Sequence, residues 1–163
     1  MENLQKSKIF IVDDNASCLF AYSSTIKKLG YQEVFVYQSS TELLNNLDER
    51  PKIIFLDYQI DHMTGLELLV KIKRQDPNVF VVLVSGQEDI PVAVSALKYG
   101  AFDYLTKEEF TLERIKKLFE KLEQVNAVVE KRKREKKLSA SLAAAASVAA
   151  MILARPFTQN NGS

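Results

Sequence analysis

The stretch Lys52-Ile53-Ile54-Phe55-Leu56-Asp57 decides the fold of this chain, because an apolar run rich in β-branched and aromatic residues stops on a single carboxylate. Such a run is typical of a buried strand that delivers a polar group to the edge of a sheet. Three other strand-like runs end in a similar way, at Asp13-Asp14, at Ser85 and at Lys107. The four endings together predict one site at one edge of a sheet.

Strand-like and helix-like patterns alternate along the chain. We expect strands at roughly 8–12, 33–37, 52–57, 79–84 and 102–105, and helices near 16–29, 40–47, 66–75, 90–99 and 110–129. This rhythm predicts an α/β fold, a doubly wound five-stranded parallel sheet with helices on both faces, because parallel neighbours need crossover connections. Gly30 and Gly100 fall where two of the helices should end.

Composition and charge narrow the function classes. The chain has 163 residues and a formal charge of +1, but seven basic residues and one acid lie between Lys131 and Arg155. That segment carries +6, which leaves −5 for the remainder, so overall charge does not support nucleic-acid binding and we expect no nucleic-acid partner. The single Cys18 cannot form an internal disulfide, and the polar start lacks an apolar signal core, so we expect a cytoplasmic protein.

The polar strand endings suggest a particular chemistry. In doubly wound sheets ligands bind beyond the carboxyl ends of the strands, where Asp13, Asp14 and Asp57 would converge. Crowded carboxylates repel one another, and Mg²⁺, a hard cation that accepts a few carboxylates, water and a phosphoryl oxygen, relieves the repulsion. One carboxylate can then attack phosphorus, with Lys107 and Ser85 as donors to the transferring oxygens. Each ending alone is more often a cap, a turn or a solvated side chain, so the joint pattern carries the interpretation.

These segments resemble the receiver domain of two-component response regulators. The matching residues are Ile9-Phe10-Ile11-Val12-Asp13-Asp14-Asn15, Ile54-Phe55-Leu56-Asp57, Met63-Thr64-Gly65-Leu66-Glu67, Val82-Leu83-Val84-Ser85-Gly86 and Gly100-Ala101-Phe102-Asp103-Tyr104-Leu105-Thr106-Lys107. The resemblance covers about residues 6–125 and implies the flavodoxin-like strand order 2-1-3-4-5. We expect the last helix to be extended at its C-terminal end.

The resemblance also implies roles for individual residues. Asp57 would accept a phosphoryl group from a histidine kinase or a histidine phosphotransfer protein, and Ser85 and Lys107 would bind the phosphoryl oxygens. The implied Mg²⁺ ligands are Asp13, Asp14, Asp57 and the backbone carbonyl of Gln59. Tyr104 matches the aromatic residue of the family that turns inward when Ser85 moves towards the phosphate. The face made by the fourth helix, the fifth strand and the fifth helix would then signal to a protein partner.

Some positions depart from the usual receiver pattern. The family often has proline four residues after the acceptor and directly after the lysine, where this chain has Asp61 and Glu108. The alternative function, a phosphatase with an aspartyl nucleophile, usually has a second aspartate two residues after the nucleophile as general acid, where Gln59 stands. We therefore expect a phosphoacceptor switch rather than an enzyme.

We divide the chain into a receiver domain (1–125), a basic helical extension (126–137) and an Ala-rich apolar tail (138–163). After residue 125 too few residues remain for a typical output domain, so we expect a single-domain regulator. Within the tail, 138–154 carries no charge and follows the basic run 131–137. This leaves two roles open, a membrane anchor and a helix that pairs two copies through heptad positions. Those positions are Leu138, Leu142, Ala145, Ala149 and Ile152.

Overall fold

The computed structural model describes residues 4–155, which fall into two compact units. The main unit is Glu2–Glu123, and the second begins at Gln124. Helix α5 (Leu112–Leu153) begins in the main unit and ends in the second. The expectation of an extended last helix is confirmed.

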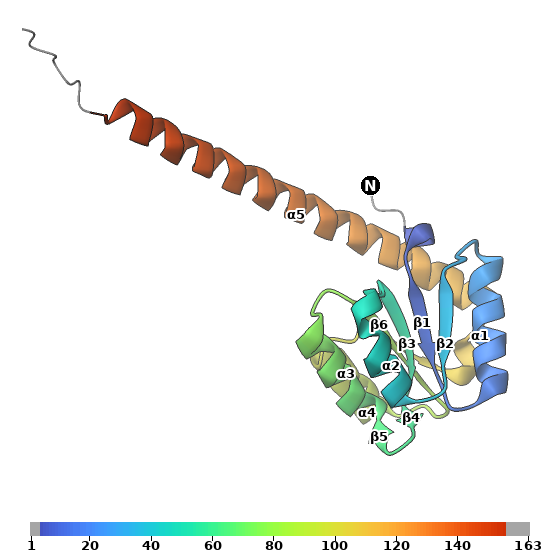
Figure 1. Ribbon diagram of the computed structural model, residues 1–163. Helices are drawn as coiled ribbons and strands as arrows, with labels where there is room; N and C mark the ends of the chain where they lie inside the picture. The colour runs from blue at the N-terminus through green and yellow to red at the C-terminus, as the bar shows by residue number, and fades with distance from the viewer. Residues whose placement is uncertain (1–3, 156–163) are drawn as a thin grey trace, which may run out of the picture. The chain divides into compact units, whose positions relative to one another are not determined.

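The main unit contains a parallel sheet of five strands in the order β2-β1-β3-β6-β7 (Figure 1). Its strands are β1 (Ile9–Val12), β2 (Val34–Tyr37), β3 (Ile53–Asp57), β6 (Phe80–Ser85) and β7 (Asp103–Thr106). Because β6 and β7 are the fourth and fifth strands of this sheet, the order is the predicted 2-1-3-4-5. All five residues of β3 are buried, as expected for a central strand covered on both faces.

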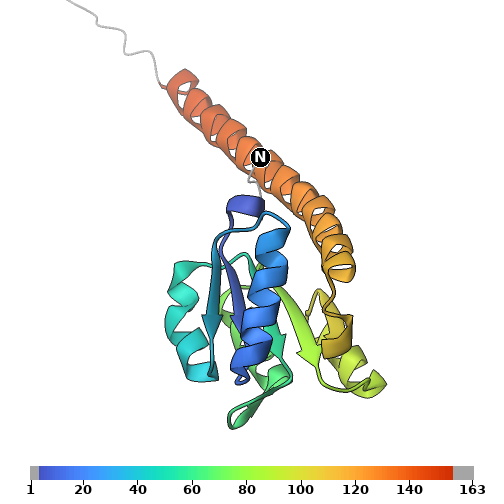
Figure 2. The same ribbon diagram turned by 90° about the vertical axis from the view of Figure 1, so that its right-hand side faces the viewer.

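Helices cover both faces of the sheet and each face has its own apolar core. The helices of the main unit are α1 (Ala16–Lys28), α2 (Ser40–Asn46), α3 (Gly65–Gln75), α4 (Ile90–Lys98) and the first turns of α5, with short 3₁₀ helices at Leu4–Lys6, Leu47–Glu49 and Lys107–Glu109. Ile53 and Phe55 pack with α1 and α5, whereas Ile54 and Leu56 pack with α2 and α3. Alternate residues of one strand thus enter opposite cores. In Figure 2 helix α1, drawn in blue, lies in front of the strands.

A small hairpin follows β3 that the periodicity of the sequence did not predict. Strands β4 (Gln59–Ile60) and β5 (Met63–Thr64) pair antiparallel, and Asp61 between them has a left-handed φ of 50°. The hairpin leads directly into α3, which Thr64 and Glu67 cap with a reciprocal pair of hydrogen bonds. The hairpin and the helix cap therefore fix the course of the backbone directly after β3.

The C-terminal unit is helical from Gln124 to Leu153. Every residue from Arg134 to Arg155 is exposed. Helix α5 carries an apolar stripe that is buried at Ile115, Leu118, Phe119 and Leu122, while Val125 is 36% exposed. The core-facing role of the stripe thus ends near the boundary between the units. The part of the predicted tail at 156–163 lies outside the described residues.

Candidate functional site

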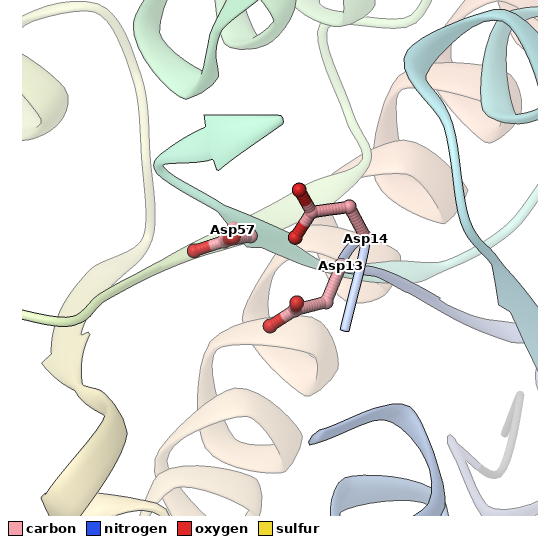
Figure 3. A group of neighbouring side chains, drawn as sticks. All are labelled: Asp13, Asp14 and Asp57. Carbon is pink, nitrogen blue, oxygen red and sulfur yellow. The ribbon is translucent and has the colours of Figure 1, made fainter. Parts of the chain in front are cut away.

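Three carboxylates meet at the carboxyl-terminal edge of the sheet. Asp57 is the last residue of β3, and Asp13 and Asp14 directly follow the neighbouring strand β1 (Figure 3). One oxygen of each carboxylate lies within 4.8 Å of the others. Asp13 and Asp57 are buried and Asp14 is exposed, so the cluster is open to solvent on the Asp14 side.

A lysine ammonium lies between the two buried carboxylates. Lys107 Nζ is 2.8 Å from Asp13 Oδ2 and 3.4 Å from Asp57 Oδ2. Lys107 follows the last residue of β7, so it reaches the cluster from the far side of β6. The structure thus brings together Asp13, Asp14, Asp57 and Lys107, four of the residues that the sequence placed at one site.

The protonation of Asp57 reflects its surroundings. Burial, followed by the negative charge of Asp13, raises the pKa of Asp57 from 3.8 to about 6. Lys107 and the backbone N–H of Gln59 act in the opposite direction, but they do not cancel the rise. Burial alone would lower the pKa of Lys107, but its hydrogen bond to Asp13 and the charge of Asp57 raise it overall. A cluster with this unbalanced negative charge favours a bound cation.

The oxygen-only donor set fits Mg²⁺. Asp13, Asp14 and Asp57 offer hard anionic ligands, which magnesium prefers to sulfur or nitrogen. Each of the three carboxylates could offer one oxygen to the ion, which would take its remaining ligands from water and a substrate oxygen.

Ser85 and Tyr104 are joined through one residue of the loop after β6. Ser85 Oγ accepts a hydrogen bond from the backbone N–H of Gln87 at 3.3 Å, and the Tyr104 hydroxyl donates to the carbonyl of Gln87 at 2.8 Å. Ser85 is buried at the end of β6, beside the end of β3. Tyr104 packs its ring partly against the core of α2, α3 and α4.

Two structural residues of the site were not predicted from the sequence. Gly65 lies so close to the end of β3 that a Cβ there would be 2.7 Å from the Asp57 carbonyl oxygen. Asp61, which the sequence marked only as a departure, accepts a hydrogen bond from the backbone N–H of Ser40 at 2.6 Å and so ties the hairpin to the start of α2. The hydrogen bond from Tyr104 to the Gln87 carbonyl was not predicted either, because any residue type can provide a backbone carbonyl. Glu108 stands where the family often has proline, and the Lys107–Glu108 peptide is trans.

Comparison with known proteins agrees with this geometry. Residues 9–120 match the model of the response regulator receiver domain. The response regulator protein TmoT of Ectopseudomonas mendocina is 36% identical over 64% of this chain and 48% of its own length. The crystal structure of the receiver domain of NtrX from Brucella abortus is 31% identical, with a TM-score of 0.65, over 70% of this chain and 96% of that one. The BeF3-activated receiver domain of DrrB, a Thermotoga maritima protein, is 29% identical, with a TM-score of 0.61, over 71% of this chain and 98% of that one.

A doubly wound parallel sheet with an acidic cluster and a lysine at its carboxyl edge is the arrangement expected of a receiver domain. The chain belongs to the response regulator receiver domain family. The chain spans about half the length of the curated relatives it matches.

Proposed function

We propose that this protein is a phosphorelay switch in which Asp57 accepts a phosphoryl group from the phosphohistidine of a histidine kinase or histidine phosphotransfer protein. The observation that carries the proposal is the convergence of three carboxylates and the Lys107 ammonium at one open edge of the sheet. The proposed Mg²⁺ ligands are Asp13, Asp14, Asp57 and the backbone carbonyl of Gln59. When bound, Mg²⁺ supplies positive charge against the transferring phosphoryl oxygens.

The side chains of the site divide the remaining chemistry. A carboxylate oxygen of Asp57 forms a bond to phosphorus while the bond from phosphorus to the donor imidazole nitrogen breaks, and the imidazole leaves with the bonding electron pair. Lys107 can hold a phosphoryl oxygen because its ammonium already lies beside Asp57. The Ser85 hydroxyl is the proposed further donor, which its position at the end of the adjacent strand supports.

We propose that the signal leaves through the face formed by α4, β7 and the start of α5. Movement of Ser85 towards the phosphoryl group would pull on Gln87 and release the Tyr104 hydroxyl, which now bonds to the Gln87 carbonyl. Helix α4 buries only Ala96 and exposes Ile90, Val94 and Leu97. An apolar surface of this kind suits a protein partner. We place the receiver domain in the cytoplasm and assign no nucleic-acid partner, and its output would be a protein–protein contact of residues 1–125.

Phosphorylation at Asp57 can be tested directly. The full chain is incubated with acetyl phosphate and Mg²⁺, and the acyl phosphate is trapped by borohydride reduction and mapped by mass spectrometry. We expect label at Asp57 in the native protein, loss of label with EDTA, and none in Asp57→Asn. Equal labelling of Asp57→Asn would overturn the assignment of Asp57 as the phosphoacceptor. Undiminished labelling of the native protein in EDTA would show that phosphorylation does not require Mg²⁺.

A further inference from the structure

We propose that the C-terminal helical segment 138–154 inserts into an anionic membrane, with the basic segment 131–137 at the lipid headgroups. The proposal concerns residues outside the acidic site and does not depend on phosphorylation. It rests on three properties of the described residues: the apolar character around the whole helix, the charge that precedes it, and a heptad pattern too short for stable helix pairing.

Segment 138–154 is apolar on every side. It contains no charged residue, and its three serines, Ser139, Ser141 and Ser147, do not share one helical face. All of its residues are exposed, and none of the most apolar window of α5 is buried. A helix that is apolar all round needs an apolar environment. Within residues 4–155 no part of the chain provides one.

The charge before this segment identifies the partner. Residues 131–137, Lys-Arg-Lys-Arg-Glu-Lys-Lys, carry six basic residues and one acid, and all but Lys133 are exposed. Anionic lipid headgroups attract such a juxtamembrane run, and each basic residue near the surface strengthens binding roughly five-fold. The basic run therefore suits the headgroup region of an anionic bilayer, and the apolar helix directly after it suits the hydrocarbon core.

The alternative partner, a second copy of this helix, fits less well. The heptad positions Leu138, Leu142, Ala145, Ala149 and Ile152 span only about two heptads, whereas a coiled-coil pattern needs at least three to four. Continued towards the N-terminus, the same spacing falls on Glu135 and Lys131. Parallel pairing would also place two strongly basic runs side by side. Alanines at two of the five positions bury little area.

The dimensions allow a transmembrane or deeply inserted helix. Seventeen residues at 1.5 Å each extend about 26 Å, slightly less than a hydrocarbon core of about 30 Å. Lys137 and Arg155 flank the segment, and their long side chains can reach the headgroups from just inside the core. The excess of positive charge before the segment keeps the receiver domain on the cytoplasmic side.

Vesicle flotation of the full chain tests the proposal. The protein is mixed with vesicles of pure phosphatidylcholine, or of two parts phosphatidylcholine to one part phosphatidylglycerol. We expect flotation with the anionic vesicles and at least ten-fold weaker binding to the neutral ones, because the basic run contributes only with anionic lipid. Protein that binds neither kind of vesicle would overturn the proposal.

Two adjacent alanines provide a matched pair of variants that separates membrane insertion from helix pairing. Ala145 occupies a heptad position and Ala144 lies about 100° away, off that seam. A lysine near the centre of an inserted helix weakens insertion on any face, so Ala144→Lys and Ala145→Lys should each reduce vesicle binding by about 100-fold. The opposite result would be dimers in analytical ultracentrifugation that only Ala145→Lys dissociates, with both variants binding vesicles like the native protein. That result would overturn membrane insertion and assign the segment to helix pairing. Labelling of Asp57 by acetyl phosphate should be the same in both variants, which separates this result from the proposed function.

Discussion

At the scale of single residues, the site holds more negative charge than its own cation neutralises. Lys107 contacts both Asp13 and Asp57, yet burial and the charge of Asp13 still raise the pKa of Asp57 to about 6. In metal-free protein the ionised Asp57 therefore destabilises the fold relative to the unfolded chain, in which its pKa is near the ordinary value. The same imbalance is what a divalent cation would relieve.

We predict that Asp57→Asn stabilises the metal-free protein at neutral pH by about 2 kcal/mol. Below about pH 3 Asp57 is protonated in both the folded and the unfolded states, so the variant gains nothing there. As the pH rises from about 3 to about 7 the unfolded chain releases its proton first, the native protein loses stability, and the advantage of the variant grows to its full size. Urea denaturation in EDTA between pH 3 and pH 8 measures the difference.

The control for this experiment is Asp48→Asn, which makes the same chemical change at an exposed aspartate. Its stability should follow that of the native protein at every pH. If Asp57→Asn were destabilising at pH 7 in EDTA, the Asp57 carboxylate would stabilise the fold and the electrostatic account of the site would be wrong.

Sequence reasoning identified the charged residues of the site but not the groups that hold them. Asp13, Asp14, Asp57 and Lys107 were identifiable because each ends or directly follows a strand-like run, and parallel strands bring their ends to one edge. Asp61 had no such signal, since its role depends on a contact with the backbone of Ser40 from another part of the chain. Contacts to backbone atoms far apart in sequence do not impose a local pattern.

At the scale of elements, the start of α3 positions the end of β3. The Gly65 N–H donates to the Tyr58 carbonyl at 2.7 Å, and the absence of a Cβ at Gly65 permits this approach. A Cβ there would lie 2.7 Å from the Asp57 carbonyl oxygen and 2.9 Å from Tyr58 Cα. Both are backbone atoms, so the helix and the strand would have to separate.

We predict that Gly65→Ala destabilises the protein by about 1–3 kcal/mol and lowers the rate of Asp57 phosphorylation, because the acceptor shifts with its own carbonyl. Thermal unfolding and acetyl phosphate labelling measure the two effects. Gly86→Ala is the matched control, since a Cβ at Gly86 meets nothing within 4 Å and its φ is not positive. It should leave stability within about 1 kcal/mol of the native value. Equal stability of the two variants would contradict the role given to Gly65.

The long elements were predictable and the short ones were not. The strand-like runs predicted all five strands of the main sheet to within a few residues. The signal is clearest for β1, β3 and β6, because a strand buried on both faces is continuously apolar. Strands β4 and β5 have two residues each, too few for any periodicity. Their pairing depends on the left-handed turn at Asp61 and on the bond from Gly65 to Tyr58, which are tertiary features.

At the scale of the whole receiver domain, two hydrogen bonds join Ser85, at the end of β6, to Tyr104, which packs against the core under α4. They run from Ser85 through both backbone groups of Gln87 to the Tyr104 hydroxyl. Tyr104 lies on β7, next to β6 and in contact with the core under α4. A shift of Ser85 by a bound phosphoryl group would therefore reach a surface that exposes Ile90 and Val94. These hydrogen bonds act as a switch only if they have two arrangements, intact and broken, and the phosphoryl group favours one of them.

We predict that beryllofluoride with Mg²⁺, a mimic of the phosphoryl group, changes amide hydrogen exchange throughout α4 and β7 as well as in the loops around Asp57. The Tyr104→Phe variant keeps the ring and lacks only the bond to Gln87. In this variant α4 should exchange faster before the mimic is added and change less afterwards, since the contact that the phosphoryl group would break is already absent. Protection of the site loops should respond to the mimic equally in both proteins, which controls for binding. A response confined to those loops in the native protein would show that occupation of the site does not reach the α4 surface.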